Sequence, residues 1–161
     1  ALVLSGVAGG YWISQNAQEK AELAKLKEEV QETKRIMQAM LDNQSSASQR
    51  LQGVTVALNM NSADNDVVSA LVITMNEDPS SNVRLAALDA LSKFQNEAGV
   101  RKALIKSLST QKDPIVQIAL IQLLVRMKEK SVIKDLERMV DDEQNIKAVK
   151  DEASSGILKL S

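Results

Sequence analysis

The chain has 161 residues, in which 20 lysines and arginines are balanced by 21 aspartates and glutamates. This balance gives no electrostatic case for nucleic-acid binding. The sequence has no cysteine and no histidine, which excludes disulfides, thiolate metal sites and the commonest general base of enzymes. It has one Trp, one Tyr and one Phe, and a core of aliphatic side chains suits helices packed on helices. The composition therefore favours an all-α protein without catalytic, cofactor or metal chemistry.

The first 13 residues, ALVLSGVAGGYWI, carry no charge and include the aromatic pair Tyr11 and Trp12 near their end. A membrane-spanning helix needs about 20 apolar residues, so this run is too short alone. Aromatic residues gather at membrane–water interfaces, and we therefore interpret residues 1–14 as the distal part of a transmembrane helix that begins upstream of Ala1. The alternatives are a signal-peptide remnant and a helix packed on the rest of the chain.

Residues 15–43 contain no proline or glycine and predict one long helix. Apolar or uncharged residues recur on it at alternating steps of three and four, flanked by lysines and glutamates, which is the pattern of a coiled-coil seam. We expect a helical spacer or short coiled coil, with either a second copy in a parallel homodimer or the rest of the chain covering the stripe. Its members are Leu23, Leu26, Val30, Thr33, Met37 and Met40.

A short polar break, residues 43–48, predicts the start of a second domain, residues 44–161. Short helices alternate there with turns rich in capping residues, and Asp113-Pro114 has the order of an N-cap followed by a first-turn proline. The apolar spacing predicts helices over residues 48–59, 66–76, 82–94, 100–108, 115–127, 131–140 and 145–160.

Val83, Val116 and Val149 are each 33 residues apart, and similar apolar runs follow the first two. A fixed period of this length on helical residues is typical of stacked helix pairs. Because each layer must cover its neighbours, we expect four leucine and isoleucine side chains at repeating positions to be buried. These are Leu88, Leu91, Ile121 and Leu124.

The segment from Asp78 to Leu91, Asp-Pro-x-x-Asn-Val-Arg-x-Ala-Ala-x-x-Ala-Leu, resembles the HEAT repeat family. The resemblance implies a short right-handed α-solenoid of helix pairs preceded by the long N-terminal helix. It also implies an inter-repeat polar ladder formed by Asp78, Asp113 and Arg84. The ladder is interrupted further on, because Gln117 and Lys150 stand at the positions equivalent to Arg84.

In that family the second helix of each pair lines a concave binding face, which here corresponds to residues 82–94, 115–127 and 145–160. The expected function is therefore protein–protein interaction with a partner of unspecified identity. The candidate partner-binding residues on these helices are Arg84, Lys93, Gln117, Gln122, Arg126 and Lys150.

The order of apolar segment, helical spacer and repeats is similar to the membrane-distal part of bacterial anti-sigma-factor-like proteins. That resemblance implies a single-pass inner-membrane protein whose repeat domain is a periplasmic sensor or scaffold arm. The family's zinc module has no counterpart here, so any sigma-factor binding would lie outside this chain. The alternative is a soluble secreted or cytosolic helical-repeat adaptor without a membrane anchor.

Two acidic clusters, Asp64/Asp66 and 141–143, could be read as acid–base pairs or a calcium loop. Neither matches the spacing of a calcium loop. Both fall in predicted turns, where carboxylates cap helix N-termini. We therefore assign them to capping and expect no enzyme activity.

Overall fold

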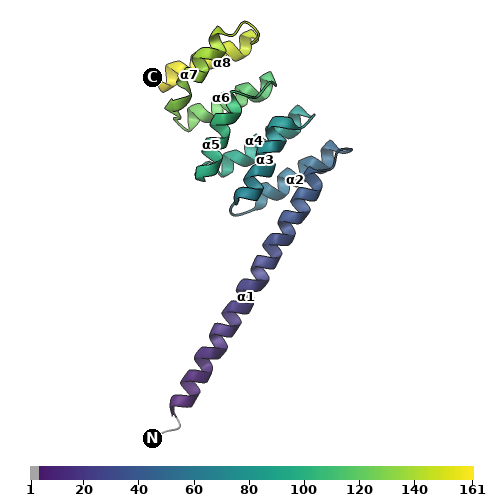
Figure 1. Cartoon of the computed structure of the whole chain (residues 1–161), viewed down its shortest axis with the longest axis vertical. Coiled ribbons are helices and arrows are strands. Elements are labelled where there is room, and N and C mark those ends of the chain that lie inside the picture. The colour runs from purple at the N-terminus through teal and green to yellow at the C-terminus, as the bar shows by residue number, and fades with distance from the viewer. Residues whose placement is uncertain (1–3) are drawn as a thin grey trace. The chain divides into compact units, whose positions relative to one another are not determined.

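The computed structural model describes the backbone of residues 4–161 and the side chains of residues 17–97 and 99–161. Within that range the chain is all helical (Figure 1), which confirms the predicted fold class. The helices are α1 (Leu4–Leu41), α2 (Ala47–Asn59), α3 (Asn65–Glu77), α4 (Ser81–Lys93), α5 (Ala98–Leu108), α6 (Pro114–Arg126), a 3-10 turn η1 (Lys130–Val132), α7 (Ile133–Asp141) and α8 (Lys147–Leu160).

The chain divides into two compact units, Ala1–Ile36 and Met37–Ser161. The first unit is part of α1, and within it Leu23, Leu26 and Val30 are exposed. The membrane prediction for residues 1–14 lies outside the described side chains. Among the residues described, no helix is both long enough and apolar enough to cross a membrane.

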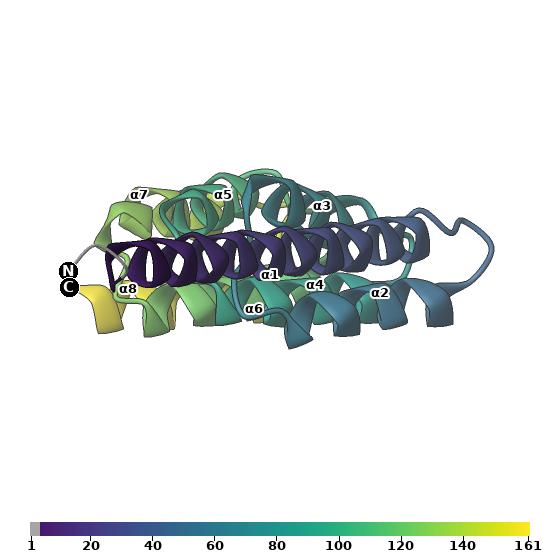
Figure 2. The ribbon, with the colours of Figure 1, turned by 90° about the horizontal axis from the view of Figure 1, so that it is seen from below.

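The second unit is built from helix pairs in two layers. The helices α3, α5 and α7 form one layer, and α2, α4, α6 and α8 form the other (Figure 2). Within the second layer, α2 packs on α4, α4 on α6 and α6 on α8. Because α3 also packs on α4, α5 on α6 and α7 on α8, each helix pair is covered by the next. This is the arrangement that the repeat period predicts.

The second unit begins at Met37, whereas the polar break in the sequence suggested a boundary at residue 44. Met37 is completely buried and Leu41 nearly so, because the last turns of α1 pack against α2. Glycine permits that approach: a Cβ at Gly53 would lie 3.0 Å from Met40 Cβ and 3.1 Å from the Leu41 side chain. The end of α1 therefore serves as the first helix of the first pair, and Met37 is committed to this core rather than to a coiled-coil seam.

The core consists of aliphatic side chains with one aromatic ring, Phe94. The four leucine and isoleucine residues predicted to be buried between layers are all 4% exposed or less, which confirms that prediction. Gly156 in α8 is a second close approach, since a Cβ there would lie 3.1 Å from Leu136 and 3.2 Å from Val125. Close packing across the repeats therefore depends on small residues at the points where helices cross.

The helix N-termini follow the predicted capping chemistry. Asp64 accepts a hydrogen bond from Val67 N at 3.2 Å, and Asp113 accepts from Ile115 N at 3.0 Å. Ser46 accepts from Gln49 N at the start of α2. In the second acidic cluster, Asp142 accepts from Gln144 N at 2.9 Å. These carboxylates satisfy backbone N–H groups that a helix start or turn leaves unpaired.

Candidate functional site: polar rungs and the face of the second helices

The most deeply buried charges of the repeats are Arg50 in α2 and Asp78 in the turn between α3 and α4. Arg50 Nε donates to Asp78 Oδ2 at 2.6 Å and Nη2 donates to Oδ1 at 3.0 Å, and the two side chains are only 6% and 4% exposed. Arg50 Nη1 also donates to the carbonyl of Asn43 at 2.9 Å. The hydrogen bond to Asp78 raises the pKa of Arg50 above its ordinary value, so both groups stay charged.

A second rung connects α4 with the turn before α6. Arg84 Nη1 lies 3.4 Å from Gln111 Oε1 and 3.8 Å from Asp113 Oδ2, while its Nε donates to the carbonyl of Asp78. The hydroxyl of Ser81 donates to Asp113. That hydrogen bond is the main reason why the pKa of Asp113 is lowered, with smaller contributions from the backbone N–H groups of α6 and from Arg84. The turn is thus bonded to the preceding repeat.

At the third equivalent position, glutamine replaces arginine. Gln117 Nε2 donates to the carbonyl of Gln111 at 2.8 Å, just as Arg84 donates to the carbonyl six residues before it. Among the described residues, no hydrogen bond joins Gln117 to the turn before α8, where Asn145 instead donates to the carbonyl of Met139. The ladder therefore has two charged inter-repeat rungs and ends at α6.

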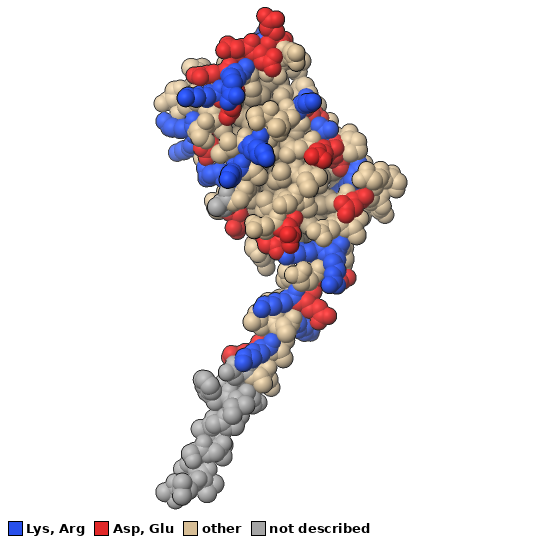
Figure 3. Space-filling view, viewed as in Figure 1, with Lys and Arg blue, Asp and Glu red and all other residues tan. Residues whose placement is uncertain are grey.

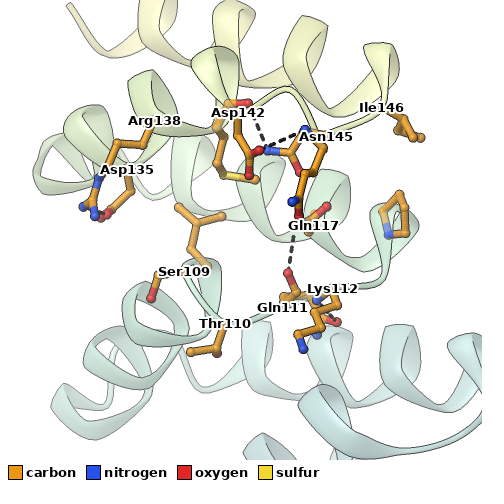
Figure 4. Close-up of a pocket in the computed structure, with 14 residues that line it drawn as sticks. Ser109, Thr110, Gln111, Lys112, Gln117, Asp135, Arg138, Asp142, Asn145 and Ile146 are labelled. Carbon is orange, nitrogen blue, oxygen red and sulfur yellow. Dashed lines mark hydrogen bonds and ion pairs between the residues drawn. The ribbon is translucent and has the colours of Figure 1, made fainter.

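Two hollows of about 700 Å³ each open at the edge where these turns lie. One lies beside Gln117, between the turn before α6 and the helices α7 and α8, and its wall includes the neighbouring Asp135 and Arg138 (Figure 4). The other is lined by Arg50 and Asp78, whose rung is intact. Since a hollow of the same size occurs with and without the arginine, the loss of the rung does not create it.

The first-helix layer has its own inter-repeat link. Arg101 in α5 donates to Glu129, just before η1, at 2.8 Å. Glu129 also accepts from the Ser131 hydroxyl at 2.6 Å. These two donors lower the pKa of Glu129, Ser131 contributing more. On the face shown in Figure 3, acidic and basic side chains are interspersed over the repeats, so the surface is charged without being dominated by one sign.

A smaller groove of about 130 Å³ lies between α4 and α6, on the layer of second helices. Two buried leucines, Leu88 and Leu123, form its apolar floor. Exposed Asp89, Gln122 and Arg126 stand at its rim. Gln122 Nε2 donates to Glu152 of α8 at 3.2 Å, which continues the polar rim onto the next helix.

The candidate partner-binding residues divide into two groups. Arg84, with a side chain 20% exposed, and the buried Gln117 belong to the polar rungs described above. Lys93, Gln122 and Arg126 are exposed on α4 and α6, and Lys150 on α8 is half-buried. Lys93 is also engaged locally, because its Nζ donates to the carbonyls of Leu58 at 2.5 Å and Met60 at 2.8 Å at the end of α2.

Arg50 was missed by the sequence reasoning. Its signal is a weaker copy of the repeat: Arg50-Leu51 with Gly53 two residues later matches Arg84-Leu85 with Ala87, 34 residues further along. The 33-residue count from Val83 did not reach it, because the first repeat is one residue out of step. Asp113 was assigned to the ladder, and the structure shows that it also caps α6.

A protein-family model described as HEAT repeats matches residues 68–156, which are 89 of the 161 residues. The chain belongs to the HEAT repeat family. No curated protein and no solved structure matches it. Among the described residues, no group of histidine, cysteine, aspartate or glutamate side chains has the arrangement needed to hold a metal ion.

Removing one partner of the Arg50–Asp78 rung should strongly destabilise the repeats. Arg50→Ala should lower the free energy of unfolding by about 3–5 kcal/mol, because it leaves the Asp78 carboxylate buried without its counter-charge. Arg35→Ala breaks an ion pair whose side chains are 76% and 59% exposed, so it should cost less than about 1 kcal/mol. Denaturant titration followed by circular dichroism measures both.

The double variant Arg50→Met with Asp78→Asn controls for the loss of packing. It removes both charges, so it should recover part of the stability that Arg50→Met alone loses. Equal losses in the single and double variants would show that the rung contributes only through its volume.

Proposed function

We propose that the repeat domain binds a segment of a partner protein on the face formed by α2, α4, α6 and α8. HEAT repeats serve as protein-interaction modules, and this layer presents one helix from each pair along a continuous surface. The observation that carries the proposal is the groove between α4 and α6, which combines an apolar floor with a rim of exposed polar and charged groups. That combination is typical of an interaction site.

The two larger hollows fit this role less well. Their walls are polar, and in the hollow beside α3 the buried rung has already paired its charges with each other. A buried pair with its hydrogen bonds made offers little to a ligand, whereas the leucine floor gains from being covered. We therefore expect an apolar side chain of the partner to enter the groove and an acidic group beside it to meet Arg126.

The finer proposal is that the N-terminal segment holds this module at a membrane, as the anti-sigma-factor-like organisation implies. On this hypothesis residues 1–14 continue a single membrane helix, and the repeat domain is a periplasmic sensor or scaffold arm at the inner membrane. The uncharged run with Tyr11 and Trp12 near its end supports the proposal. A soluble adaptor with the same repeats is the competing hypothesis, and non-enzymatic function is expected for both.

Site-specific crosslinking in the cells that make the protein tests the docking face. A photoreactive phenylalanine analogue at Gln122 should give a discrete adduct with a partner, since that position lies at the groove. The same probe at Lys102, which is exposed on α5 in the other layer, should not give it.

Adding Arg126→Glu to the Gln122 probe should reduce the adduct severalfold, because it replaces a rim cation by an anion. Equal adducts at Gln122 and Lys102, or an adduct indifferent to Arg126→Glu, would contradict the assignment of the face.

The fluorescence of Trp12, the one tryptophan of the sequence, tests the membrane proposal directly. Phosphatidylethanolamine–phosphatidylglycerol vesicles should shift its emission to shorter wavelength, because the indole leaves water for the interface. Val7→Asp should abolish the shift, since a charge within so short an apolar run is costly to insert. An unchanged spectrum, with the chain left behind when the vesicles are floated, would favour the soluble adaptor.

A further inference from the structure

The first compact unit leaves a line of large apolar side chains exposed. On α1, Leu23 is 52% exposed, Leu26 57% and Val30 42%. Their spacing of three and then four residues places them on one side of the helix. Met37, which continues the same spacing, is fully buried in the repeat core. The stripe available to a partner is therefore the part that ends before Met37.

The charges beside this stripe define what can cover it. With Leu23 and Val30 at heptad position a and Leu26 at d, Lys20 and Lys27 occupy e, and Glu22 and Glu29 occupy g. In a parallel pair, each g residue faces the e residue of the following heptad on the other helix. In an antiparallel pair, e faces e and g faces g.

We propose that two copies of this chain pair in parallel and in register along α1 between Glu19 and Thr33. Parallel pairing sets Glu22 of each copy against Lys27 of the other, which gives two attractive contacts. Antiparallel pairing sets lysine against lysine and glutamate against glutamate. The argument does not use Lys34, the next e residue, because it is largely buried within its own chain.

The seam residues also suit two strands. A β-branched residue at a with leucine at d favours a parallel dimer, and Val30 and Leu26 have that order. Parallel pairing places the C-terminal ends of both helices at one end of the seam, so both repeat domains follow from that end. A partner with two binding segments would then gain avidity. The dimer itself is independent of which face of the repeats binds a partner.

The absence of cysteine from the sequence makes disulfide crosslinking a clean test in the full chain. Leu23→Cys, Leu26→Cys and Val30→Cys, made one at a time, should each give a disulfide-linked dimer under mild oxidation. In a parallel in-register pair, identical a or d positions face each other at a distance that a disulfide can span. Glu28→Cys, at the outward-facing f position, is the matched control and should stay unlinked.

An antiparallel pair meets its own position at one point only, so linkage at a single seam site would overturn the proposed orientation. A chain that sediments as a monomer at tens of micromolar, with the amides of α1 protected from exchange, would show that the stripe folds back within one copy. Either result overturns the proposal, as does linkage at Glu28→Cys equal to that at the seam.

Charge exchange tests the register independently. Glu22→Lys alone, or Lys27→Glu alone, turns both attractive contacts into repulsive ones and should weaken dimer formation about tenfold. Mixing the two variants restores an opposite-charge pair at both contacts, so the heterodimer should approach the affinity of the unmodified chain. Sedimentation equilibrium measures all three. A mixture no tighter than either variant alone would overturn the pairing of Glu22 with Lys27.

Discussion

The structure depends on one constraint: no helix pair of this chain can bury its own apolar surface. Leu91 of α4 and Leu124 of α6 are fully buried because a neighbouring layer lies on each side of them. Each helix of the second layer packs on the next, and the chain of contacts runs from α2 to α8. Stability is therefore a sum over neighbouring interfaces, and it must begin and end somewhere.

At the beginning, α1 supplies the missing neighbour. Its last turns place Met37 and Leu41 against α2, where Gly53 lets the two backbones approach closely. At the other end, α8 buries Val149, Ala153 and Gly156 on one side and leaves Leu158 81% exposed on the other. The polar rungs act within this apolar stack. A buried ion pair contributes little net stability but penalises any slip in register, because a shifted Arg50 would leave Asp78 unpaired.

Much of this could be read from the sequence. The 33-residue spacing of the valines predicted the repeat, and the alternating apolar positions predicted which leucines are buried. The family motif around Arg84 pointed to the polar ladder. These features are local or periodic, so a single sequence reveals them.

What the sequence did not reveal is how distant segments share residues. Arg50 carries the strongest rung, yet its partner lies 28 residues away and its motif is one residue out of step. The apolar stripe of α1 has a single continuous period, but Met37 packs into the repeats while Leu23 stays exposed. Periodicity shows that a face is apolar; only tertiary packing decides what covers each part of it.

The most direct test of this account compares the stability of two fragments, residues 31–161 and 44–161, in denaturant. The first keeps the turns of α1 that carry Met37 and Leu41, and the second removes them. The account predicts that 31–161 unfolds in one cooperative transition and that 44–161 is less stable by at least about 3 kcal/mol, since two buried large side chains are lost. Equal stability of the two fragments would contradict it, because the repeat core would then begin at α2 and need no helix before it.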